Sequence, residues 1–92
     1  MDKLNEDMVE QALESVGDWT LNGESIQRTF AHDDFMGSME FVRAVADLAE
    51  AAQHHPDILI RWNKVTLTLS THDAGGLTER DFMLAKSIDQ LG

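Results

Sequence analysis

Three of the four histidines are placed where they could act together on protons. His54 and His55 are adjacent, and His72 follows further along the chain. The ordinary pKa of imidazole is about 6.5, so such groups both give and accept protons at neutral pH. General acid–base catalysis is therefore the chemistry that these residues favour. The chain has no cysteine, which excludes thiolate zinc sites, disulfides and cysteine nucleophiles.

A zinc site built from three histidines is the main alternative, because imidazole binds zinc and an open fourth position would support hydrolysis. The spacing disfavours it, since adjacent helical side chains such as His54 and His55 diverge by about 100°. They would converge on one ion only if the chain breaks between them, and Pro56 allows such a break. We predict that the protein binds no metal, and the three-histidine zinc site is the alternative.

The element that must position these residues is a hairpin after Pro56. Its predicted arms are residues 58–62 and 65–70, joined at Asn63 and Lys64. With Trp62 opposite Val65, the apolar residues of both arms share one face, which fixes the register.

Extending this register beyond the arms brings two histidines together. His55 falls opposite His72, His54 lies beside them at the end of a helix, and His32 lies elsewhere. We therefore predict a cluster of His54, His55 and His72 next to the glycine-rich turn at residues 73–76. A single histidine would more often cap a helix, but three brought together favour catalysis.

The remaining patterns predict a complete set of elements around the second hairpin. In chain order they are a helix from Asn5 to Gly17, a hairpin at Asn22–Gly23 with Trp19 opposite Ile26, a long amphipathic helix from Asp33 or Asp34 to about His54, the second hairpin, and a helix from Thr78. Asn-Gly is the strongest short hairpin signal, and Thr78 with Asp81 forms a capping-box pattern. We predict an α+β fold in which three helices pack on one face of a four-stranded antiparallel sheet, as one domain over residues 1–92.

Charge and length narrow the possible partners. The net charge of −10 repels nucleic-acid phosphates and anionic membranes, so direct nucleic-acid binding is disfavoured. No segment approaches the roughly 20 apolar residues of a membrane span, and the N-terminus has no signal-peptide pattern, so we expect a cytoplasmic protein. A chain of 92 residues leaves much surface unburied, which favours a homo-oligomer.

The spacing of the histidines with their neighbours resembles a known family. The pattern Glu50-x3-His54-His55-Pro56-x5-Trp62-x9-His72-x8-Asp81, with the segments Ser70-Thr71-His72 and Gly76-Leu77-Thr78-Glu79-Arg80-Asp81, is similar to the signature of the pterin-4a-carbinolamine dehydratases. The resemblance covers essentially the whole chain. It departs at Ile58, where many relatives have tryptophan, and at Gln53, where some have an acidic residue.

The resemblance implies removal of water from 4a-hydroxytetrahydropterin to give quinonoid dihydropterin, in the recycling of the tetrahydrobiopterin cofactor. It implies no metal or organic cofactor. It also implies a fold of a four-stranded sheet with three helices, assembled as dimers or tetramers. Glu50, Trp62 and Asp81 belong to the signature. We expect them to be a helix-surface charge, a core aromatic residue and a helix cap rather than catalytic groups.

Dehydration needs an acid for the departing hydroxyl and a base for the N5 proton. We predict His54 and His72 as the proton-transfer pair and His55 as a binding or assisting group. The substrate-binding residues that we predict are Gln53, Ser70, Thr71 and Asp73, with the Asp73 carboxylate accepting the pterin 2-amino and N3 donors. A non-catalytic interaction module, using the polar face of the second hairpin, is the alternative function.

Overall fold

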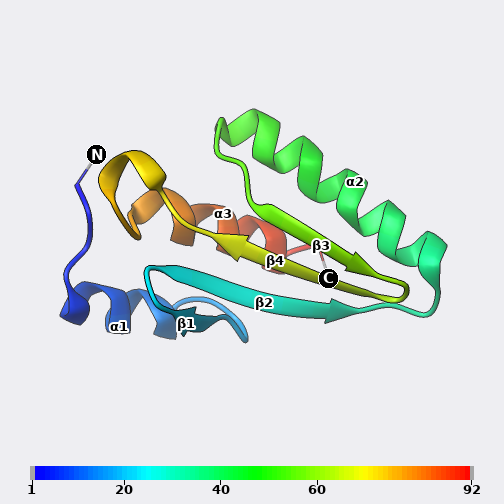
Figure 1. The fold of residues 1–92 in the computed structure, drawn as a ribbon, viewed down its shortest axis with the longest axis horizontal. Coiled ribbons are helices and arrows are strands. Elements are labelled where there is room, and N and C mark those ends of the chain that lie inside the picture. The colour runs from blue at the N-terminus through cyan, green and yellow to red at the C-terminus, as the bar shows by residue number, and fades with distance from the viewer. Residues whose placement is uncertain (1, 92) are drawn as a thin grey trace.

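The computed structural model describes residues 2–91. Its elements are α1 (Glu6–Glu14), β1 (Thr20–Asn22), β2 (Ser25–Ala31), α2 (Phe35–Ala52), β3 (Asp57–Arg61), β4 (Lys64–Leu69), a single 3₁₀ turn (His72–Ala74) and α3 (Glu79–Asp89). The four strands form one antiparallel sheet in the order β1-β2-β4-β3. The predicted α+β fold is confirmed (Figure 1).

One face of the sheet carries the core. Val65, Leu67 and Leu69 alternate along β4, are fully buried, and join a single cluster with apolar residues of β2 and of all three helices. Because side chains alternate along a strand, the residues between them point to the opposite face. That opposite face is largely polar, with Thr66 and Thr68 on β4, and no helix of the described residues covers it (Figure 1).

The helix boundaries follow local signals that the sequence carries. The Asn5 side chain accepts the amide of Met8 at the start of α1, and the Asp34 side chain accepts the amide of Gly37 at the start of α2. The capping box predicted at Thr78 is present on α3.

The end of α2 has a special backbone conformation. Gln53 follows the last helical residue in the left-handed region, with φ of 53° and ψ of 41°. This conformation turns the chain out of the helix before His54, and Pro56 prevents the helix from continuing.

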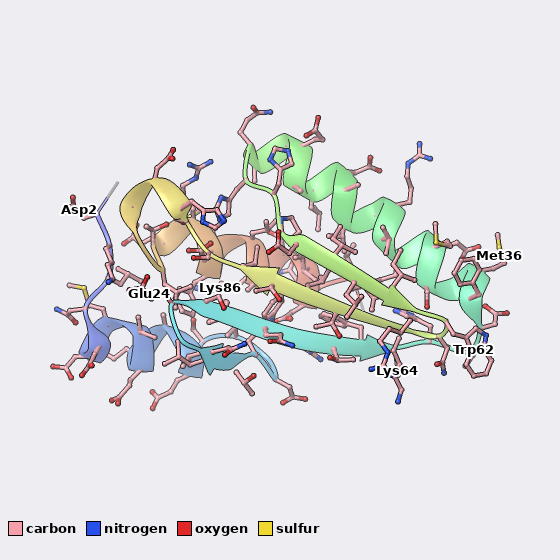
Figure 2. The ribbon with its side chains drawn as sticks, in the orientation of Figure 1. Asp2, Glu24, Met36, Trp62, Lys64 and Lys86 are labelled. Carbon is pink, nitrogen blue, oxygen red and sulfur yellow. The ribbon has the colours of Figure 1, made fainter. Side chains whose placement is uncertain are left out.

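The registers predicted for both hairpins are wrong by two residues. In the second hairpin Ile60, not Trp62, pairs with Val65, and the loop is Trp62–Asn63. Trp62 takes a positive φ of 52° and is 69% exposed rather than buried, as it projects from the hairpin tip in Figure 2. For the residues that stay within the strands, a shift of two keeps each side chain on its predicted face, because the strand period is two.

In the first hairpin Leu21 rather than Trp19 pairs with Ile26, and the loop is Gly23–Glu24. Trp19 lies before the paired residues and is buried, where its indole Nε1 donates to Asp89 Oδ1 at 2.7 Å. Asp89 also accepts from the Gly17 amide and from Arg28 Nη1, so it ties the end of α3 to the first hairpin.

Within residues 2–91, the structure has no helix that is both long and apolar enough to cross a membrane.

Candidate functional site

A cavity of about 340 Å³ lies on the polar face of the sheet, near the ends of β3 and β4. Its lining residues are Glu24, Ser25, His55, Asp57, Thr68, Ser70 and His72. Ser25 and Thr68 stand next to buried core residues of β2 and β4, so their side chains point away from the helices. The cavity is therefore a polar site on the face that the helices leave open.

Two of the three predicted histidines share this cavity. Asp57 pairs with Thr68, and continuing this pairing by two residues brings His55 level with Ser70 rather than with His72. His72 begins the 3₁₀ turn just beyond β4 and lines the same cavity. Both histidines thus line one cavity, although the register that predicted their convergence was shifted.

A carboxylate orients His55. Its Nε2 lies 2.5 Å from Oε2 of Glu50, which is in the last turn of α2. Both side chains are exposed, so the pair is open to solvent and to a ligand. With Nε2 donating to the carboxylate, the neutral ring carries its proton on that nitrogen and offers Nδ1 as an acceptor.

His54 is not part of the same cavity, which corrects the predicted cluster of three. It is 8% exposed, and its Nε2 lies 2.5 Å from Oδ1 of Asp81 on α3. Its ring also lines a groove of about 390 Å³ between α2 and α3. Since the two histidines are adjacent in an extended segment, His54 faces the helices and His55 faces the open side of the sheet.

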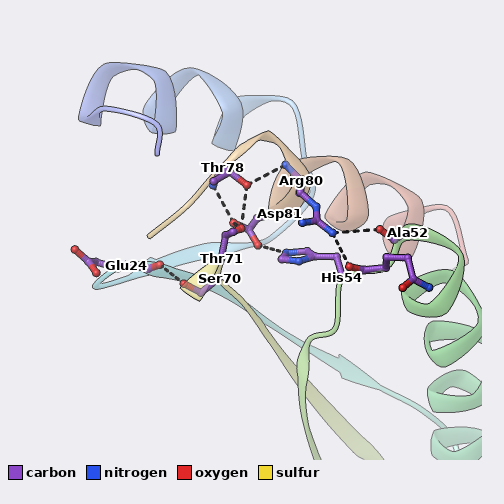
Figure 3. A network of polar contacts seen from close by, with 9 residues as sticks. Glu24, Ala52, His54, Ser70, Thr71, Thr78, Arg80 and Asp81 are labelled. Carbon is purple, nitrogen blue, oxygen red and sulfur yellow. Dashed lines mark hydrogen bonds and ion pairs between the residues drawn. The ribbon is translucent and has the colours of Figure 1, made fainter. Parts of the chain in front are cut away.

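The Asp81 carboxylate is fully buried and anchors a chain of hydrogen bonds (Figure 3). Its Oδ2 accepts from the Thr78 amide and from the Thr71 hydroxyl, each at 2.9 Å. The Thr71 and Thr78 hydroxyls are 2.9 Å apart, and Thr78 Oγ1 accepts from the Arg80 amide. Asp81 is thus a helix cap, as predicted, and also the partner of His54.

The four predicted substrate-binding residues lie in different places. Ser70 lines the cavity, and its hydroxyl donates to the Glu24 carbonyl at 2.9 Å. Thr71 is buried in the Asp81 network. Gln53 is exposed at the end of α2, and Asp73 is exposed in the 3₁₀ turn; neither lines this cavity.

Sequence reasoning did not assign four polar side chains to the cavity: Glu24, Ser25, Asp57 and Thr68. Asp57 and Thr68 face each other across β3 and β4, and Glu24 comes from the first hairpin, where Lys3 Nζ lies 3.0 Å from its Oε1. The alternation along the second hairpin would have identified Asp57 and Thr68 as residues of the polar face. Glu24 could not be found this way, because it comes from a different hairpin.

The fourth histidine is remote from the cavity, as predicted. His32 stacks on Phe41, with ring centroids 4.8 Å apart, and lines a larger hollow of about 890 Å³ beside the start of α2. Among the described residues that line this hollow, His32 is the one histidine. Among residues 2–91, no group of three histidine or carboxylate side chains is arranged to hold a metal ion.

Comparison with known proteins places the chain in a family. A family model described as "Pterin 4 alpha carbinolamine dehydratase" matches residues 2–91. The chain belongs to this family. Relatives named pterin-4-alpha-carbinolamine dehydratases include one from Roseiflexus castenholzii, 54% identical over 96% of this chain and 95% of its own length. Another, from Acidobacterium capsulatum, is 52% identical over 99% of each chain. The family and the names of these relatives indicate an enzyme of the lyase class.

Two solved structures are similar to this chain. A Brucella melitensis protein described as a transcriptional coactivator/pterin dehydratase has a TM-score of 0.93 and 33% identity, over 98% of both chains. A pterin dehydratase-like protein described as a RuBisCO assembly factor of the alpha-carboxysome has a TM-score of 0.69 and 26% identity, over 82% of this chain and 89% of its own. The Brucella melitensis structure thus matches this fold over 98% of the chain.

Proposed function

We propose that this chain removes water from 4a-hydroxytetrahydropterin to give quinonoid dihydropterin, and so serves the recycling of a tetrahydropterin cofactor. The observation that carries the proposal is the placement of His55 and His72 in one polar cavity. Family membership supplies the substrate class, and the two imidazoles supply the acid and the base that this dehydration requires.

In the proposed mechanism the two imidazoles exchange two protons with the substrate. Neutral His55, with Nε2 held by Glu50, takes the proton from N5 through Nδ1. Protonated His72 gives its proton to the 4a-hydroxyl, the C4a–O bond breaks, and water leaves as the C4a=N5 double bond forms. His55 then loses its proton to solvent and His72 regains one, so the cycle needs no metal or oxidant.

This assignment revises the proton-transfer pair expected from sequence. His54 was predicted as a partner of His72, but its Nε2 is bonded to Asp81 on the helical side of the chain. We propose that His54 fixes the start of the extended segment. Its neighbour His55 can then stay on the opposite side, toward the cavity.

The carboxylate of Asp57 is the group that we propose for the donor edge of the pterin. It lines the cavity, whereas the predicted residue Asp73 does not. The 2-amino group and N3–H offer two parallel donors, which a carboxylate accepts together as it accepts a guanidinium. Ser70 is proposed as a further polar contact, and roles for Gln53, Thr71 and Asp73 in binding stay predictions.

Binding is tested by titrating the labelled protein with 7,8-dihydropterin, an isomer of the product, while recording amide NMR spectra. We expect the largest shifts at Asp57, Thr68, Ser70 and His72. The amide of His32 lies near the other hollow and should not move. Shifts centred on His32, or none at millimolar ligand, would contradict the proposed site.

We further propose that the chain works in the cytoplasm as a homodimer or homotetramer. The small size of the chain supports this, as does the sheet face that no helix covers. Light scattering at micromolar concentration should give a multiple of the chain mass of 10.3 kDa. A mass of one chain would refute the oligomer and leave the proposed chemistry standing.

A further inference from the structure

The C-terminus of α2 has an unusual need for an external partner. The last carbonyl groups of a helix lack intrahelical donors and carry partial negative charge. The last turn of α2 contains no basic residue, and the chain leaves it through Gln53 in the left-handed conformation. This conformation suits glycine and is uncommon for other residues, so surrounding contacts must hold it.

Arg80 supplies that partner from α3. Its Nη2 donates to the carbonyl oxygen of Gln53 at 2.5 Å and lies 3.4 Å from that of Ala52 (Figure 3). The guanidinium thus places a positive charge at the negative end of α2, where it also satisfies free acceptors. The Gln53 side chain contributes a local contact through Nε2 to the Glu50 carbonyl at 2.8 Å.

Two consecutive residues of α3 therefore hold two consecutive residues after α2. Arg80 holds the Gln53 carbonyl, and Asp81 holds the His54 ring. His55 comes next in the chain and must meet Glu50 of α2 and the cavity at the same time. The direction in which the chain leaves α2 consequently sets the position of His55.

We propose that Arg80 is a positioning residue of the reaction. By holding Gln53 in the left-handed conformation, it aims His55 into the cavity without touching the substrate. The effect of Arg80 on turnover rests on the proposed function. Its effect on the backbone is independent of that function.

The kinetic test compares Arg80→Gln with Arg43→Gln, the same change at an exposed position on α2. Arg80→Gln should lower kcat on the order of 10- to 100-fold with little change in KM, because a small misplacement of a reacting group is costly. Arg80→Lys, which keeps the charge and one donor, should recover part of the loss. Arg43→Gln should match the unaltered protein.

A double substitution separates positioning from general stability. Glycine takes the left-handed conformation readily, so the loss caused by Arg80→Gln should shrink in a Gln53→Gly background. An equal fold-loss in both backgrounds would overturn the proposal, as would a loss that Arg80→Lys does not reduce.

Hydrogen exchange gives a result that does not depend on turnover. The His54 amide donates to the Ala49 carbonyl at 3.1 Å across the left-handed turn. In Arg80→Gln this amide should exchange about tenfold faster or more, while the amides of β4 keep their rates. Exchange equal to that of Arg43→Gln would refute the role of Arg80. Faster exchange in a protein without dehydratase activity would refute only the proposed function.

Discussion

Replacing His72 or His55 with alanine is expected to lower kcat for dehydration on the order of 10²-fold or more. Both imidazoles line the cavity, and general acid–base groups typically contribute 10²–10⁴ to the rate. The double variant should lose less than the product of the two single losses, because the two groups act as one proton-transfer unit. Stopped-flow absorbance of product formation measures all three variants.

His32→Ala is the control for these variants, since His32 lines a different hollow and has no place in the mechanism. It should turn over like the unaltered protein. If folded His55→Ala and His72→Ala proteins matched the rate of His32→Ala, the cavity would not be the active site. Large losses at His54→Ala and His72→Ala, with none at His55→Ala, would instead favour the pair expected from sequence.

Replacing Asp81 with alanine is expected to lower the free energy of unfolding by about 3–5 kcal/mol. The carboxylate is fully buried and accepts hydrogen bonds from His54, Thr71 and the Thr78 amide. The substitution leaves these three donors without their acceptor in a site that water does not reach, and it also removes the helix cap. Urea unfolding followed by circular dichroism measures the change.

Asp73→Ala provides the matched control, because Asp73 is an exposed aspartate close by in the chain. Its free energy of unfolding should stay within about 0.5 kcal/mol of that of the unaltered protein. Equal unfolding midpoints for the two variants would show that the buried network does not hold α3 against the end of α2.

Local signals made much of the fold predictable. The caps at Asn5, Asp34 and Thr78 lie where the residue types place them, since each satisfies free amides with a neighbouring side chain. The apolar face of the second hairpin was also correct along its strands, because an error of two residues leaves the alternation unchanged. The loop of the second hairpin was not predictable, since Trp62 at positive φ contradicts the usual preference for asparagine or glycine.

Contacts between distant elements limited the prediction of the site. Alternation alone would have placed His54 and His55 on opposite sides of an extended segment, and the expected cluster overlooked this. The bonds from Asp81 to His54 and from Arg80 to Gln53 join residues of α3 to the end of α2. These bonds depend on how the two helices pack, which a short sequence motif does not specify.

The central claim is tested most directly by turnover of synthetic 4a-hydroxytetrahydropterin in the presence of a metal chelator. The predicted result is quinonoid dihydropterin formed well above the rate in buffer, unchanged by the chelator and reduced to near the buffer rate in the His55→Ala, His72→Ala double variant. If the unaltered protein formed quinonoid dihydropterin only at the buffer rate, the proposed dehydratase activity would be contradicted and a protein-interaction module favoured. Activity abolished by the chelator and restored by zinc would contradict the metal-free mechanism.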